Sequence, residues 1–193
     1  MSEAAPQQKA ALRAETRERR RGMTRDTLDT SAKGILSHLQ ALVTEIGARR
    51  IGCYLSTVDE PPTRSFIEWA LERHIEVLLP ISRDDGLLDW AHFSAGEEGV
   101  DSLGMPIPAG DVLGPVAIDT VDLLVIPASL VDRAGFRMGW GRGYFDRTLG
   151  SMGHRPPVFA VVYDHEVVDS VPRETHDQPV DGVVTPSGII RLP

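Results

Sequence analysis

The sequence predicts a single three-layer α/β domain with a mostly parallel sheet. Residues 50–82 read as strand, helix and strand, a β-α-β unit whose crossover makes its two strands parallel. A later apolar run, 121–131, leads into a glycine-rich loop, a helix and another strand, so the alternation continues. At 193 residues the chain is long enough for one well-buried domain and short for two, so we expect one domain over 1–193.

The N-terminal part predicts two helices. Residues 7–22 read as a charged helix with little apolar face, and we expect a cationic helix within 1–22 to pack on the domain. A second helix runs from about Thr27 to Ile46, with Thr24 and Thr27 both candidates for its cap. Its apolar side chains fall on one stripe, formed by Ile35, Leu36, Leu39, Leu42, Val43 and Ile46.

The β-α-β unit is built from short elements. Residues 50–56 form a continuous apolar run, which is typical of a buried strand. A turn-rich loop, 57–62, then precedes a helix that has Thr63 as its N-cap. The strand 76–81 completes the unit. The helix carries apolar side chains at core spacing, namely Phe66, Ile67, Ala70 and Leu71.

The remaining elements alternate with turn signals. Asp84-Asp85-Gly86 indicates a hairpin turn into a strand over 87–93. Residues 94–120 are rich in Gly, Pro and acids, so we expect an excursion over the surface, and a lid over the site is left open. The last predicted elements are strand 121–127, helix 144–152, strand 158–163 and a strand over 183–185.

Composition excludes several functional classes. Hydrophobic content of 41% and charged content of 25% are ordinary for a globular protein. A net charge of −8 argues against nucleic-acid binding, and no apolar run is long enough to span a bilayer. Without a signal-peptide core, we expect a cytoplasmic monomer with no nucleic-acid or membrane partner. Cys53 is the only cysteine, and we interpret it as a buried structural thiol.

The most informative stretch is Arg137–Leu149, which reads Arg-Met-Gly-Trp-Gly-Arg-Gly-Tyr-Phe-Asp-Arg-Thr-Leu. A strand, a glycine-rich loop and a helix start together aim backbone N–H groups and a positive dipole end at one point. Arg137 and Arg142 add cations, which suits an oligophosphate. The P-loop and G-x-G-x-x-G patterns are absent, and a tight turn with solvated arginines stays open. The backbone can approach a ligand closely at three alternating glycines, Gly139, Gly141 and Gly143.

This string resembles the signature of the 5-formyltetrahydrofolate cyclo-ligase family, also called methenyltetrahydrofolate synthetases. Val131, Met138 and Phe145 depart mildly from the family's Phe, Leu and Tyr. The resemblance runs from Lys9 to about Thr185 and implies a sheet akin to that of sugar-phosphate isomerases and CoA transferases. The matching positions are Pro127, Asp132, Gly135, Arg137, Gly139, Gly141, Gly143, Tyr144 and Asp146.

The resemblance implies ATP-dependent conversion of 5-formyltetrahydrofolate to 5,10-methenyltetrahydrofolate, with ADP and phosphate released. Lys9 and Arg13 lie four apart on one helix face, where charge alone also fits a solvated face. Arg137, Arg142 and Tyr144 are the residues expected to act in catalysis. The implied ATP site comprises Lys9, Arg13, Arg137, Gly139, Trp140, Gly141, Arg142, Gly143, Tyr144 and Phe145.

The same resemblance implies folate and metal sites. Glu60, with Thr63 three residues later, matches a family pair that contacts folate, although an exposed loop acid also fits the residues. Mg²⁺ is implied on Asp146 and Asp177, which by themselves also read as a helix-start acid and a turn residue. The implied folate site comprises Leu55, Glu60, Trp140, Gly141, Arg142, Gly143 and Tyr144.

Three questions stay open at this level. The ring of Trp140 is suited to stack on the pterin or the adenine, or to wall off the loop. A non-catalytic relative that binds folate or nucleotide is one alternative function. The other alternative function is a sugar-phosphate isomerase or an acyl-CoA enzyme on a similar sheet. Such enzymes do not need the N-terminal cationic helix or the aspartate pair.

Overall fold

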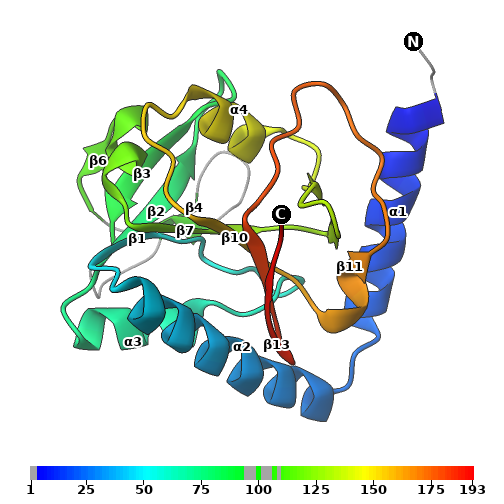
Figure 1. The fold of residues 1–193 in the computed structure, drawn as a ribbon, viewed down its shortest axis with the longest axis horizontal. Helices are drawn as coiled ribbons and strands as arrows, with labels where there is room; N and C mark the ends of the chain where they lie inside the picture. The colour runs from blue at the N-terminus through cyan, green and yellow to red at the C-terminus, as the bar shows by residue number, and fades with distance from the viewer. Residues whose placement is uncertain (1–3, 94–98, 101–105, 108–109) are drawn as a thin grey trace.

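An eight-stranded sheet dominates the computed structural model, which describes residues 4–93, 99–100, 106–107 and 110–193 (Figure 1). The inner strands from β12 to β2 pair in parallel, and antiparallel strands are added at both ends. The mostly parallel α/β sheet predicted from the sequence is therefore confirmed. The strand order is β13 (Gly188–Arg191), β12 (Gly182–Thr185), β10 (Val158–Val161), β7 (Leu123–Pro127), β1 (Arg50–Gly52), β2 (Glu76–Ser82), β3 (Leu88–His92) and β6 (Val112–Leu113).

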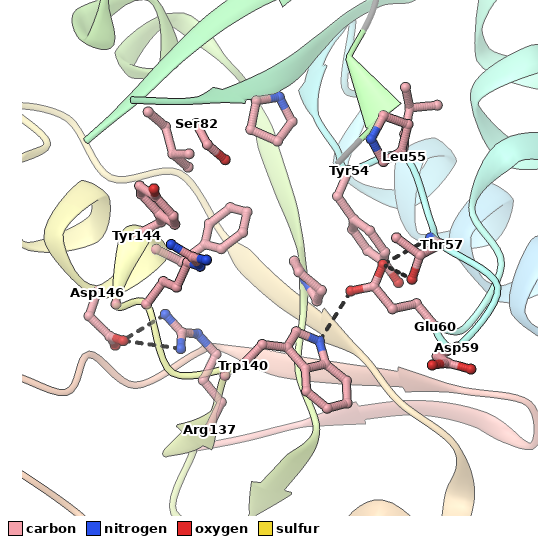
Figure 2. A pocket seen from close by; sticks show the side chains of 18 of the residues that line it. Tyr54, Leu55, Thr57, Asp59, Glu60, Ser82, Arg137, Trp140, Tyr144 and Asp146 are labelled. Carbon is pink, nitrogen blue, oxygen red and sulfur yellow. Dashed lines mark hydrogen bonds and ion pairs between the residues drawn. The ribbon is translucent and has the colours of Figure 1, made fainter. Parts of the chain in front are cut away.

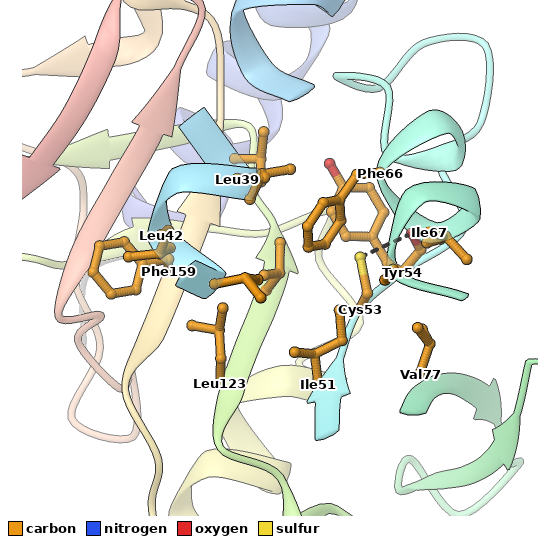
Figure 3. Packing of buried hydrophobic residues seen from close by; sticks show 14 of the residues in the cluster. Leu39, Leu42, Ile51, Cys53, Tyr54, Phe66, Ile67, Val77, Leu123 and Phe159 are labelled. Atoms are coloured by element: carbon orange, nitrogen blue, oxygen red, sulfur yellow. Dashed lines mark hydrogen bonds between the residues drawn. The ribbon is translucent and has the colours of Figure 1, made fainter. Parts of the chain in front are cut away.

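Helices cover both faces of this sheet and make three layers (Figure 1). Because strand side chains alternate between faces, Leu123 and Val125 enter one core, while Leu124 and Ile126 enter the other. The first core packs against α2 (Arg25–Ile46) and α3 (Arg64–Glu72), as Figure 3 shows. The second packs against α4 (Tyr144–Ser151) and the 3-10 helix η1 (Pro115–Thr120).

The ends of α2 follow local rules. The helix begins after Thr24, whose hydroxyl oxygen accepts a hydrogen bond from the N–H of Thr27, so the first of the two candidate caps is the one used. It ends at Gly47, which has a left-handed φ of 71° that suits a residue without a Cβ. The predicted stripe of Ile35, Leu39, Leu42 and Val43 is buried between these ends.

Helix α1 (Ala4–Arg21) lies beside a small three-stranded sheet at the edge of the molecule (Figure 1). Arg20 fixes it there through two hydrogen bonds to Glu166, of 2.7 and 2.8 Å, with both side chains almost fully buried. Arg20 also donates to the carbonyls of Asp59 and Ala128. The small sheet comprises β11 (Val167–Val168), β8 (Leu130–Asp132) and β9 (Arg137–Met138), and η2 (Asp164–Glu166) precedes β11.

Several boundaries differ from the prediction. The strand predicted over 50–56 ends at Gly52, because the chain beyond it leaves the sheet to form a loop. The segment predicted as a surface excursion lies mostly at the surface over 110–120, but it also contributes β6 to the sheet edge and Ile118 to the core, which was not predicted. The possible lid over the site was placed in 94–120, and most of the first half of that segment lies outside the described residues, namely 94–98, 101–105 and 108–109. The hairpin β4 (Gly99–Val100) and β5 (Pro106–Ile107) falls between them.

Two further predictions concern single features. Cys53 is fully buried, and burial raises the pKa of its thiol to about 12, which makes it a structural thiol as predicted. No helix in the described part of the chain is long and apolar enough to cross a bilayer.

Candidate functional site

A cavity of about 370 Å³ opens where the parallel strands end. Leu55 follows β1, Ser82 ends β2 and Pro127 ends β7, so the cavity lies at the carboxyl edge of the sheet, where ligands of such sheets collect. Figure 2 shows Glu60 and Thr57 on one side, Arg137 and Asp146 on the other, and Trp140 between them. One part of its wall is apolar, formed by Tyr54, Leu55, Pro80, Leu88, Pro106, Pro127 and Phe145.

The glycine-rich loop, defined here as residues 139–143, forms one wall. Gly141 and Gly143 have φ values of 101° and 69°, in the left-handed region that favours glycine. Gly141 is also pressed against Arg13, because a Cβ there would lie 3.3 Å from its guanidinium. Among the described residues, the N–H groups of this loop donate no hydrogen bond to another backbone group. The start of α4 therefore presents free donors, as the sequence predicted.

Arg137 and Asp146 form a buried ion pair behind that loop. The guanidinium donates to the two carboxylate oxygens at 3.1 and 3.4 Å, and the side chain of Arg137 is 2% exposed. Burial lowers the pKa of Arg137, while Asp146 opposes that shift. The Nε of Arg137 is buried without a partner within the described residues. An unpaired donor in a charged group beside a cavity is suited to an anionic ligand.

Lys9 and Asp177 form a second ion pair. The Lys9 Nζ lies 2.7 Å from Glu174 and 3.2 Å from Asp177, which joins α1 to the segment after β11. Burial opposes the charge, but hydrogen bonds to Glu174 and Asp177 raise the pKa of Lys9 overall. Asp177 also accepts from the N–H of Glu174, so it closes a turn as well.

The two aspartates proposed for Mg²⁺ lie on adjacent segments. The N–H of Gln178, next to Asp177, donates to Asp146 at 3.2 Å. Their carboxylate oxygens are the hard donors that Mg²⁺ prefers, so the donor set fits this ion. Each carboxylate is paired with a cation, so bound Mg²⁺ must share or replace those partners. One group of possible ligands within 4.8 Å of one another in the described chain comprises Glu174, His176 and Asp177, without Asp146.

Glu60 lies on the opposite side of the cavity from Arg137 and Asp146 (Figure 2). It is 7% exposed, and one carboxylate oxygen accepts from the N–H and hydroxyl of Thr57 at 2.9 and 3.1 Å. The other oxygen accepts from the indole N–H of Trp140 at 3.1 Å (Figure 2). The exposed loop acid considered from the sequence is therefore wrong. The guanidiniums of Arg17 and Arg20 lie 5.0 and 5.2 Å from the Trp140 ring and hold it from α1.

Thr63, the partner of Glu60 in the family pattern, has a different place. It stands at the N-cap of α3, but its hydroxyl donates to the carbonyl of Tyr54 at 2.5 Å and accepts from the N–H of Ser56. It is fully buried and does not line the cavity. Thr63 therefore anchors the base of the loop that carries Glu60.

The cavity gathers most of the residues singled out from the sequence. It is lined by Leu55, Glu60, Arg137, Gly139, Trp140, Arg142, Gly143, Tyr144, Phe145 and Asp146. Lys9, Arg13, Gly141 and Asp177 lie outside its lining, although Arg13 donates to the carbonyl of Gly139 at 2.8 Å. Arg17, which continues the four-residue spacing of Lys9 and Arg13, also lines the cavity, although the resemblance did not place it in the predicted site. Pro127, a position of the family signature, also lines the cavity, although it was not placed in the predicted site. For the remaining lining residues the sequence carries no comparable signal: Tyr54, Thr57, Asp59, Pro80, Ser82, Leu88 and Pro106.

Comparison with known proteins identifies the family of this chain. The model of the 5-formyltetrahydrofolate cyclo-ligase family matches residues 5–186. The chain belongs to this family. A 5-formyltetrahydrofolate cyclo-ligase of Mycolicibacterium smegmatis is 32% identical, with 97% of this chain and 98% of the relative covered. One of Escherichia coli K12 is 28% identical, with 90% and 97% covered.

Solved structures of the family share the fold. The NMR structure of a 5,10-methenyltetrahydrofolate synthetase from Aquifex aeolicus has a TM-score of 0.80 at 25% identity. That match covers 95% of this chain and 92% of the other. A synthetase from Mycoplasma pneumoniae has a TM-score of 0.72 at 18% identity, with 92% and 98% covered. The family match begins one residue after the start of α1, and it includes the glycine-rich loop.

Proposed function

We propose that this protein converts 5-formyltetrahydrofolate to 5,10-methenyltetrahydrofolate and consumes ATP as a co-substrate. Membership of the family supports the overall conversion. The observation that supports a reaction with ATP is that one cavity has two walls of different chemistry. Glu60 and an apolar surface form the wall for a ring system, and Arg137, Arg142 and the glycine-rich loop form the wall for phosphates.

The chemistry accounts for both walls. A formyl amide is a poor electrophile, and its oxygen is a poor leaving group. Transfer of the γ-phosphoryl group of ATP to that oxygen releases ADP and leaves an activated imidate-like phosphate. The lone pair of N10 then attacks the formyl carbon and the ring closes. N10 gives up its proton to the solvent and the C–O bond breaks, so inorganic phosphate departs and the methenyl product is left. No Ser or Cys nucleophile is required, which agrees with the buried state of Cys53.

The protein's part is positioning and charge neutralisation, which dominate phosphoryl transfer. Arg142 and Arg137 supply positive charge, and the N–H groups of the glycine-rich loop, which donate to no backbone group in the described chain, are available to phosphate oxygens in the same region. Tyr144 lines the cavity next to them and shapes the junction between the two substrates. Asp146 and Asp177 are the residues that would hold Mg²⁺, which supplies charge neutralisation at the phosphates when bound.

The direct test is turnover by the purified protein. It is incubated with 5-formyltetrahydrofolate with and without Mg-ATP, while the absorbance of the methenyl product and the release of ADP are followed. We expect equal amounts of product and ADP, and neither without ATP. Binding without turnover would instead indicate a non-catalytic relative, and activity on another substrate without ATP would indicate an isomerase or acyl-CoA enzyme.

Glu60→Gln is expected to raise the KM for formylfolate by about tenfold or more and to leave the KM for ATP nearly unchanged. Glu60 accepts from Thr57 and Trp140 with separate oxygens, and an amide replaces one acceptor by a donor. Loss of a charge-assisted hydrogen bond to the reduced pterin is of this size. Steady-state kinetics with each substrate varied at saturation of the other gives both constants. An unchanged folate KM would remove Glu60 from the substrate site.

Asp146→Asn and Asp177→Asn are each expected to raise the Mg²⁺ concentration needed for half-maximal activity. An ion held mostly by phosphates and water needs each carboxylate for charge and placement. If both bind one ion, the effects in the double variant do not add. The asparagine keeps a carbonyl oxygen for Arg137 or Lys9, and circular dichroism checks that each variant is folded. A parental Mg²⁺ titration for Asp177→Asn alone would leave Asp177 as the closing residue of a turn.

A further inference from the structure

Arg147 links two loops on the outer side of α4. Its Nε donates to the carbonyl of Gly86 at 2.6 Å, in the turn between β2 and β3. Its Nη2 donates to the carbonyl of Arg142, in the glycine-rich loop. The side chain is exposed and does not line the cavity, so Arg147 does not touch a ligand there. One guanidinium therefore ties the hairpin turn to the loop proposed to bind phosphates.

The surrounding backbone leaves room for this guanidinium. A Cβ at Gly86 would lie 2.6 Å from its Nη2, and a Cβ at Gly143 would lie 3.1 Å from its Nη1. Both glycines have positive φ, of 84° and 69°. A second link runs beside it, because the hydroxyl of Tyr144 donates to the carbonyl of Arg83 at 3.0 Å. The guanidinium also lies 5.6 Å from the centre of the Tyr144 ring.

The contact with Arg142 sets the direction of one peptide group. The Arg142–Gly143 peptide is trans, so its C=O and N–H point in opposite directions. Because the C=O points to Arg147, the N–H of Gly143 points away from it. That N–H donates to no backbone group in the described chain, and Gly143 lines the cavity.

We propose that Arg147 is a positioning residue that holds the Arg142–Gly143 peptide so that the N–H of Gly143 is available to a phosphate oxygen of ATP. The inference rests on the proposed function. It assigns a role to a residue outside the cavity, which acts through the backbone and through no contact with substrate. An N–H held in place before binding loses less entropy when the ligand arrives.

Arg147→Ala is expected to raise the KM for ATP by about tenfold, the size of one hydrogen bond to a charged group. The KM for formylfolate is expected to change by less than about twofold, because Glu60 and the apolar wall are untouched. The matched control is Arg133→Ala, which removes an exposed arginine that pairs with exposed Asp169, and neither of these residues lines the cavity. Its two KM values are expected to equal those of the parent.

Chemical rescue separates positioning from a general loss of stability. The site of Arg147 is exposed, so free guanidinium ion at low millimolar concentration has access to it. We expect added guanidinium to lower the KM for ATP of Arg147→Ala, while sodium chloride of equal ionic strength does not. Denaturation needs far higher concentrations, so unfolding does not interfere. A structural tie alone would show lower thermal stability without this rescue.

Gly86→Ala gives an independent check that keeps Arg147 in the chain. The added methyl group occupies the place of the guanidinium, so we expect a higher KM for ATP in the parent background and little further change in Arg147→Ala. An ATP KM within about twofold of the parent in both single variants would overturn the inference. If the parent itself needs no ATP, the proposed function has failed instead, so the two failures are distinguishable.

Discussion

Replacing Arg20 by methionine is expected to cost about 3–5 kcal/mol of unfolding free energy, the largest stability effect we expect from one substitution. Arg20 makes two hydrogen bonds to Glu166 with both side chains buried, and it also binds two backbone carbonyls. Burial opposes the Arg20 charge, but Glu166 raises its pKa above the ordinary value. The substitution leaves Glu166 charged and buried without its partner, and α1 loses its main anchor.

Urea denaturation followed by circular dichroism measures this loss. Arg21→Ala is the matched control, because Arg21 pairs with Asp59 at the surface and its replacement is expected to change stability very little. In the double variant Arg20→Met, Glu166→Met, part of the stability is expected to return, since no unpaired charge stays buried. A loss in Arg20→Met no larger than that in Arg21→Ala would show that the buried pair does not anchor α1.

Arg142→Ala is expected to lower the rate by about two orders of magnitude and to raise the KM for ATP far more than that for formylfolate. Arg142 lines the cavity, and within the described residues its guanidinium makes no hydrogen bond or ion pair. It is thus available to neutralise charge that develops on the transferred phosphoryl group. Because it is exposed, its loss is expected to leave the fold intact.

The kinetics of Arg142→Ala and Arg142→Lys provide the measurement. Lysine keeps the charge but has one compact ammonium group in place of the planar guanidinium, so an intermediate rate is expected. Thermal unfolding of both variants is expected to match that of the parent. Near-normal ATP kinetics in Arg142→Ala would show that Arg142 is a solvated loop residue, which is the alternative that the sequence left open.

Local patterns in the sequence were enough for the main layers. The apolar stripe of α2 and the apolar runs of β2, β7 and β10 are periodic signals that act within one element. The glycine-rich loop and the start of α4 were predictable for the same reason, since positive φ and free N–H groups are properties of short segments. The small sheet was missed because β9 and β11 have only two residues each, too few to show a period.

The sequence by itself determined the fold class, the family resemblance and the loop that faces the cavity. Only the tertiary structure decided which charges meet. Lys9 reaches Asp177 across 168 positions, Trp140 reaches Glu60 across 80, and Arg20 reaches Glu166 across 146. The physical reason is that such pairs are chosen by packing and by the burial cost of an unpaired charge, which depend on the whole fold and leave no periodic trace in the chain.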